Sequence, residues 1–168
     1  MLRRCYSNEY LTKEPTYLDK IVCKEWHNFQ TFAKWFDENY YEIEGQRMQL
    51  DKDILNKGNK IYSPQTCIFV PQRINNLFVK RDSKRGRYPI GVYLDKYTNR
   101  FKAHISIEHE DGSKRQKHLG RFNTPEEAFE VYKIEKEKYI KEVAEEYKDK
   151  IPKELYDAMY KYEVEITD

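Results

Sequence analysis

Cysteine is scarce in this chain, which has three cysteines among 168 residues: Cys5, Cys23 and Cys67. Three thiols cannot all pair with one another, so we expect reduced thiols in an intracellular protein. None of the three has a second cysteine or a histidine at close ligand spacing. We therefore expect buried thiols that act as small apolar groups. The alternative is a three-cysteine zinc site, which requires that the fold bring the thiols together and which lacks a fourth ligand.

Long apolar stretches are also missing. No run of hydrophobic residues approaches the length of a membrane span, and no segment has the pattern of a signal peptide. The chain has no internal repeat and no low-complexity tract. These absences predict a protein of the cytoplasm that has no membrane partner.

Charged residues are abundant and unevenly distributed. They make up 36% of the chain against 39% for hydrophobic residues, so we expect a small core in one domain or two small ones. Residues 1–79 are nearly neutral, and residues 80–121 carry 12 basic and 5 acidic side chains. Residues 122–168 carry 8 basic and 14 acidic ones. The small net charge of +2 therefore conceals a basic middle segment and an acidic C-terminal segment.

Apolar residues at helical spacing predict one helix in the first half, from Trp26 to about Asn39. Its predicted buried face holds Trp26, Phe29, Phe32, Ala33 and Phe36. Residues 45–66 are rich in Gly, Asn, Asp and Lys, which indicates a loop or a short hairpin. A short buried strand or turn and then a short helix are expected over 68–78. The charged segment 80–86 has no apolar side chain and is the predicted domain boundary.

The second half shows a period of two, which predicts strands. Residues 91–94 form a short strand, and from Arg100 onward apolar and polar side chains alternate. The Asp-Gly pair at 111–112 is a strong hairpin signal, and 114–122 returns as a third strand. The Thr-Pro-Glu-Glu segment at 124–127 has the pattern of a capping box and predicts the start of a long helix.

This second half resembles an AP2 domain over roughly residues 87–140. The motifs that carry the resemblance are Gly91-Val92-Tyr93, Arg100 to Ile105, His118 to Phe122, and Thr124 to Ala128. The resemblance implies a three-stranded antiparallel sheet packed on a long helix, with the exposed face of the sheet in the major groove of DNA. Carried over by position, the residues on that face are Arg100, Lys102, His104, Lys114 and Lys117. Lysine and arginine neutralise phosphates, which suits such a face. The alternative is a basic face that is merely solvated.

The first half resembles the core of phage HNH endonucleases, which often carry an appended AP2 domain. The motifs are Leu50 to Asp53, Gly58 to Lys60, Tyr62 to Pro64, Thr66 to Val70 and Arg73 to Asn75. The resemblance implies a ββα-metal unit, in which a histidine activates water and a divalent ion stabilises the developing charge on phosphorus. Matched by position, the two metal-ligand residues are Asp51 and Asn75.

The catalytic histidine of that family is absent here. Lys52 stands at its position, and Thr66 stands where an asparagine usually orients the histidine. A lysine of ordinary pKa is protonated near pH 7, so it cannot accept a proton from water, and it repels a bound cation. We therefore expect a vestigial site without a catalytic residue, and Mg²⁺ as a cofactor only if the site is active. The alternatives are a base from elsewhere in the fold, and a Lys52 whose pKa is lowered by burial.

Together these patterns predict an α+β protein. They indicate a degenerate HNH-like domain at 1–79, a basic connector at 80–86, and an AP2-like domain with a C-terminal helical extension at 87–168. Some anti-CRISPR proteins resemble degenerate phage endonucleases. The first hypothesis is therefore a non-catalytic phage protein of the bacterial host cytoplasm that inhibits DNA cleavage by Cas9 or another host defence nuclease. The alternatives are a protein that binds double-stranded DNA and a Mg²⁺-dependent nicking endonuclease.

Overall fold

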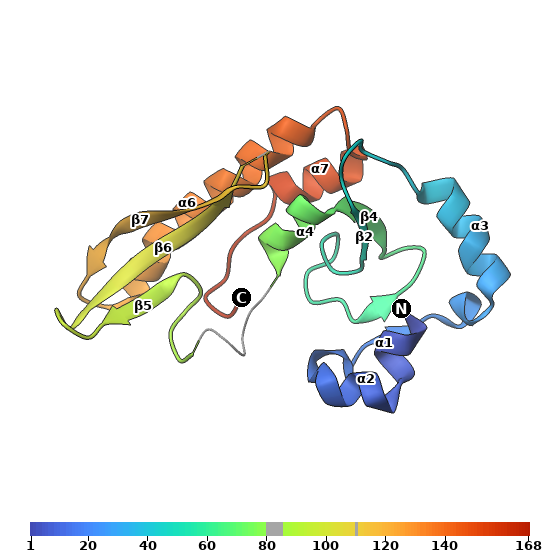
Figure 1. Ribbon diagram of the computed structural model, residues 1–168, viewed down its shortest axis with the longest axis horizontal. Coiled ribbons are helices and arrows are strands. Elements are labelled where there is room, and N and C mark those ends of the chain that lie inside the picture. Colours follow the sequence, from blue (N-terminus) through green and yellow to red (C-terminus); the bar gives the residue numbers. More distant parts are fainter. Residues whose placement is uncertain (80–85, 110) are drawn as a thin grey trace. The chain divides into compact units, whose positions relative to one another are not determined.

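The protein has an α+β fold, and its chain divides into two compact units in the computed structural model (Figure 1). The described residues are 1–79, 86–109 and 111–168. The first unit comprises Met1–Asn75 and Lys150–Leu155, and the second comprises Asn76–Asp149 and Tyr156–Asp168. The connector expected at 80–86 lies outside the described residues, apart from Gly86. No helix in the described part of the chain is both long and apolar enough to cross a bilayer.

Short elements build the first unit (Figure 1). Its helices are α1 (Leu2–Tyr6), α2 (Asn8–Lys13), α3 (Phe29–Asn39) and the start of α4 (Gln72–Phe78), with 3₁₀ turns η1 (Pro15–Tyr17) and η2 (Lys24–His27). Its strands are β1 (Ile21–Val22), β2 (Met48–Asp51), β3 (Ile61–Tyr62) and β4 (Ile68–Pro71). Strand β1 pairs in parallel with β3, and β2 pairs antiparallel with β4, so two small sheets result.

The core of the first unit forms around Trp26, which is 1% exposed. The buried members of this cluster are Cys5, Val22, Trp26, Tyr62 and Cys67. The prediction that one helix runs from Trp26 was wrong, because Asn28 interrupts it and caps α3 by accepting the amide of Gln30 at 2.9 Å. The predicted buried face was therefore wrong at Phe29, which is 72% exposed. Trp35 packs on Trp26 instead, with ring centroids 4.6 Å apart.

The second unit is a three-stranded antiparallel sheet with a long helix against one face (Figure 1). Its elements are β5 (Val92–Asp95), β6 (Arg100–Glu108), β7 (Lys114–Phe122), α6 (Pro125–Tyr147) and the end of α7 (Lys153–Tyr160). The capping box predicted before α6 is confirmed: the hydroxyl of Thr124 accepts the Glu127 amide at 3.2 Å, and the Glu127 carboxylate accepts the Thr124 amide at 3.4 Å. The predicted strands and hairpin are also confirmed.

Apolar residues of the sheet and the helix form the core of this unit. Val92, Ala103 and Ile105 of the sheet are buried, and all three lie on the face that packs against α6. The buried residues of α6 are Ala128, Phe129, Tyr132, Tyr139, Ile140, Val143, Ala144 and Tyr147. Because side chains alternate along a strand, the neighbouring polar residues of β6 lie on the other face.

Candidate functional site

The face of the sheet away from α6 carries most of the residues expected to bind a ligand. Residues directly opposite each other in an antiparallel pair share a face, so the strand register assigns every side chain to one side. We call this side the outer face. Its members are Tyr93, Asp95, Arg100, Lys102, His104, Ser106, Glu108, Lys114, Gln116, His118 and Arg121. Of the five residues predicted for this face, four are on it.

Lys117 is the exception, and its predicted position was wrong. A β-bulge shifts the register, because Ala103 lies opposite Gly120 while the next residue, His104, lies opposite His118. The extra residue reverses the alternation along β7. Lys117 is therefore opposite Ile105 on the helix-facing side, and its ammonium forms an ion pair with Glu135 of α6 at 2.6 Å.

Asp95 holds two of the cations on the outer face. Its side chain is only 6% exposed and lies 2.7 Å from the Lys102 ammonium and 3.7 Å from the Arg121 guanidinium. The hydrogen bond from Lys102 lowers the pKa of Asp95 to about 2, so the carboxylate is ionised at neutral pH. Lys114 is likewise paired with Glu108 at 3.0 Å. Arg100 has no carboxylate partner among the described residues and donates to the Arg121 carbonyl at 3.3 Å.

Three aromatic rings lie between these cations. His104 contacts Tyr93 with ring centroids 5.9 Å apart, and it contacts His118 at 4.9 Å. Tyr93 is 52% exposed, so its ring is available for contact with a ligand. The outer face thus combines cations that can meet phosphates with aromatic rings that can stack on planar groups.

The contact between the two histidines predicts a dependence of stability on pH. Burial, then His118 and Lys102, lower the pKa of His104. The unfolded chain binds this proton more readily, with a pKa of about 6.5, so stability is complete above that pH and falls as the pH drops below it. Urea titrations at pH 7.5 and 5.5 measure the loss. His104→Gln should reduce it, whereas the same change at His109, beyond the end of β6, should leave it intact; equal losses in all three proteins would contradict the prediction.

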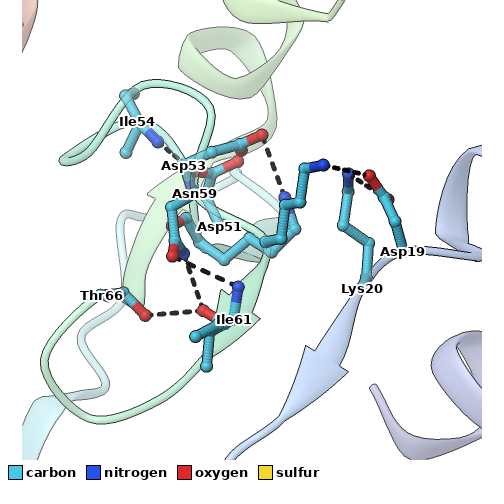
Figure 2. Close-up of polar contacts among 10 residues, drawn as sticks. Asp19, Lys20, Asp51, Asp53, Ile54, Asn59, Ile61 and Thr66 are labelled. Atoms are coloured by element: carbon cyan, nitrogen blue, oxygen red, sulfur yellow. Dashed lines mark hydrogen bonds and ion pairs between the residues drawn. The ribbon is translucent and has the colours of Figure 1, made fainter.

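The loop after β2 contains the residues matched to a nuclease site (Figure 2). Oδ1 of Asp51 accepts two backbone amides, from Asp53 at 2.9 Å and from Ile54 at 2.7 Å. Burial and the nearby Asp53 raise the pKa of Asp51. Asp51 therefore forms the turn that follows β2, and its side chain is partly buried.

Asn59 and Thr66 close this loop onto β3. The Asn59 amide donates to the Lys52 and Ile61 carbonyls, both at 2.7 Å, and the Thr66 hydroxyl donates to the Ile61 carbonyl at 2.7 Å (Figure 2). Thr66 stands where an asparagine that orients a histidine was expected, and here its hydrogen bonds hold the backbone. Asn59 belongs to the Gly58-to-Lys60 motif, but the resemblance assigned no role to its side chain.

Lys52 is buried beside the carboxylates, with 6% of its surface exposed. Its ammonium lies 3.0 Å from Oδ2 of Asp53 and 5.8 Å from the Tyr62 ring centroid. Asn75 lies on α4, and no hydrogen bond joins it to Asp51 or Lys52 in the described residues. A divalent cation does not fit this donor set, because an oxygen of Asp51 already accepts two amides and an ammonium lies beside the loop. Residues 1–79, 86–109 and 111–168 hold no group of three or more His, Cys, Asp or Glu placed for a metal.

Replacing Asp51 separates a structural role from a metal-binding one. Asp51→Ala leaves two loop amides without their acceptor, and we expect it to cost about 1–3 kcal/mol of unfolding free energy. Asp51→Asn keeps an acceptor oxygen and removes a charge that burial disfavours, so a change within about 1 kcal/mol is expected. Equilibrium unfolding in guanidinium chloride measures both. Equal losses for the two variants would show that the charge, and not the acceptor, is what matters.

The three cysteines lie in or against the core of the first unit and are free thiols. Cys5 and Cys67 are buried in the Trp26 cluster, as expected, and Cys23 packs against it. Burial raises the pKa of each thiol, that of Cys67 to about 12. Neutral thiols in apolar surroundings act as packing groups and are weak nucleophiles.

Similarity to known proteins does not identify the chain. Comparison with protein-family models, curated proteins and solved structures gave no match. The assignment of function therefore depends on the outer face and on the loop after β2. The residues of the outer face that the predicted set did not contain include Asp95, His118 and Arg121. Counting back along the strands from the Asp-Gly turn would have found His118, whereas Arg121 lies beyond the bulge.

Proposed function

We propose that the chain is a non-catalytic DNA-binding protein and that its binding surface is the outer face of the β5–β6–β7 sheet. One observation carries the proposal: the register gathers four cations and three aromatic rings on one face while α6 covers the other. The cations are Arg100, Lys102, Lys114 and Arg121. Double-stranded DNA suits such a face, because β-strands fit the major groove and basic side chains replace the counterions of the phosphates.

The rest of the proposal concerns descent and catalysis. The order of motifs supports an AP2-like sheet preceded by a degenerate HNH-like unit of a phage protein, acting in the cytoplasm of a bacterial host. Two sets of contacts support the lack of catalysis: the ion pair of Lys52 with Asp53, and the hydrogen bonds that Asp51 accepts from two backbone amides. A buried, paired ammonium offers no lone pair to accept a proton from water.

A pair of matched double variants tests the DNA-binding surface. Arg100→Ala/Arg121→Ala removes two charges from the outer face, and Arg115→Ala/Lys117→Ala removes two from the other side of β7. Each phosphate contact adds about 0.9 to the slope of log affinity against log salt, so the first variant should lower that slope by up to about 2. We expect its affinity for a duplex of about 20 bp to fall at least about tenfold at low salt, and fluorescence anisotropy measures that affinity.

The control variant should keep the slope and most of the affinity. Because both variants lose the same net charge, a difference between them reports the face and not the overall charge. If both weaken binding equally, or if the unaltered chain does not bind the duplex, the DNA-binding proposal fails.

A second candidate is inhibition of a Cas9-type nuclease through α6. The acidic composition of residues 122–168 supports it, since exposed glutamates line the helix and suit the basic nucleic-acid channel of a nuclease. These exposed residues include Glu126, Glu130, Glu142, Glu145 and Glu146. A plasmid cleavage assay with guide-loaded Cas9 tests it. Inhibition that survives Arg100→Ala/Arg121→Ala but is lost after Glu→Gln changes on α6 would favour this candidate.

The same gel, with Mg²⁺ and the protein alone, tests the lack of catalysis. We expect intact plasmid. Nicking that disappears with Asp51→Asn, a variant expected to fold, would overturn the non-catalytic proposal and favour a nicking endonuclease.

A further inference from the structure

A cavity of about 430 Å³ lies within the second unit, beside the uncovered edge of β6. Strand β5 pairs only with Arg100–Ala103 of β6, and the last contact on this edge is the His104 amide donating to the Gly91 carbonyl at 2.9 Å. Further along the edge, the Tyr139 hydroxyl contacts both the amide and the carbonyl of Glu108 at 2.8 Å. Between these two contacts the edge, the end of α4 and the middle of α6 enclose the space.

The walls of the cavity combine aromatic and aliphatic side chains with nearly as much polar surface. The apolar part includes Tyr93, Tyr132, Tyr139 and Ile105, and the polar part includes His104 and the hydroxyl-bearing Ser106. Gly91 contributes only backbone, because a Cβ there would lie 2.1 Å from the Tyr132 ring. A cavity of several hundred Å³ that joins apolar walls to placed polar groups is typical of small-molecule sites.

Lys136 is a cation in this lining without an anionic partner among the described residues. Other lysines of α6 are paired at helical spacing, Lys133 with Glu137 at 3.8 Å and Lys138 with Glu142 at 3.7 Å. The ammonium of Lys136 instead lies 5.9 Å from the Tyr139 ring centroid. Desolvation alone lowers its pKa to about 8, which agrees with the lack of a nearby carboxylate. Glu108, which also lines the cavity, is engaged by Lys114 and by the Asn76 amide.

We propose that this cavity binds a small organic anion, a carboxylate or a phosphate monoester attached to a ring, and that Lys136 is the cation that receives its charge. A partly desolvated ammonium without a counter-charge is unfavourable, and an anion that enters the cavity supplies that counter-charge. The aromatic and aliphatic walls then contact the ring of the ligand. The cavity shares Tyr93, His104 and Ser106 with the outer face, but the proposed binding of the anion does not depend on DNA binding.

Binding of defined probes to the full chain tests the site. The probes are phenyl phosphate and phenylacetate, with inorganic phosphate lacking the ring and benzyl alcohol lacking the charge. We expect phenyl phosphate or phenylacetate to bind with a Kd of about 1 mM or tighter by calorimetry, and the two controls at least about tenfold more weakly. NMR of ¹³C-labelled lysine should show the pKa of Lys136 rise when the anion binds, because an opposite charge favours the ammonium.

Two matched lysine variants assign the binding to the cavity. Lys136→Met keeps the apolar stem and removes the charge, so anion affinity should fall at least about tenfold while the fold stays as stable or becomes more stable. Lys138→Met, on the same helix but exposed and paired with Glu142, should leave affinity unchanged. The proposal fails if neither aromatic anion saturates the protein up to about 10 mM. It also fails if the two variants bind the anions equally.

Discussion

Gly91→Ala should be the most damaging small substitution in the second unit. Gly91 has φ +77°, a conformation that residues with a Cβ rarely adopt, and this strain costs about 1 kcal/mol. The added methyl group would also lie 2.1 Å from the ring of Tyr132, which is 5% exposed. Overpacking of this kind costs about 1–3 kcal/mol more, so we expect a total loss of about 2–4 kcal/mol. Urea unfolding followed by circular dichroism measures it.

Gly112→Ala provides the matched control. Gly112 has φ +78°, nearly the same as Gly91, but among the described residues, leaving aside its two chain neighbours, no atom lies within 4 Å of the position of an added Cβ. Its cost should therefore be the backbone part alone, about 1 kcal/mol. The difference between the two variants then measures the contact between Gly91 and Tyr132. Equal losses would mean that Tyr132 can move aside, contrary to the prediction.

Trp26→Ala should have the largest effect in the first unit. Trp26 is 1% exposed and packs on Phe32 and Trp35, with ring centroids 5.2 and 4.6 Å away. Truncating a buried tryptophan costs about 3–5 kcal/mol, which is comparable to the whole stability of a small unit. Trp26→Phe should cost less, because it keeps a ring in the cluster while it removes an indole N–H that is buried without a hydrogen-bond partner in the described part of the chain. Intrinsic fluorescence and circular dichroism during denaturation measure both variants.

Phe29→Ala is the control for this prediction. Phe29 belongs to the same aromatic pattern in the sequence but is 72% exposed, so its loss should change the unfolding free energy by no more than about 0.5 kcal/mol. A large loss at Phe29 would mean that its ring is covered in solution.

The architecture of the second unit was largely predictable because its signals are local. Alternation from Arg100 to Ile107 marks a strand with one buried face, and the Asp-Gly pair at 111–112 marks the hairpin. The hydroxyl of Thr124 and the carboxylate of Glu127 mark the start of α6. Each signal involves residues close in the chain, so the local sequence is sufficient to predict the element.

Features that depend on tertiary contacts were not predictable in the same way. The bulge in β7 leaves no local mark except Gly120, and it moves Lys117 to the other face. The parallel pairing of β1 with β3 joins residues about 40 positions apart and involves only two residues in each strand. Helices α1 and α2 have five and six residues, too few to show a clear periodicity.

The same distinction applies to the candidate sites. The sequence shows that a lysine, Lys52, stands at the position of the catalytic histidine. Its burial and its pairing with Asp53 required coordinates. Lys133 and Lys138 each have a glutamate four residues further along the helix, whereas Lys136 has Ile140 there, so the sequence already marks Lys136 as lacking such a partner. Its place in the lining of a cavity depends on residues distant in the chain and required coordinates.

The bulge beside Leu119 also has a consequence for how this sheet can change its ligand. Deleting that one residue would restore regular alternation and exchange the sides of the β7 residues that precede it. Arg115 and Lys117 would then join the outer face, while Lys114, Gln116 and His118 would turn toward α6. A change in strand length thus alters five side chains at once and gives the outer face a net gain of one cation, with the loss of a histidine and a glutamine. Chain length in β7 is therefore a determinant of specificity alongside the identity of its residues.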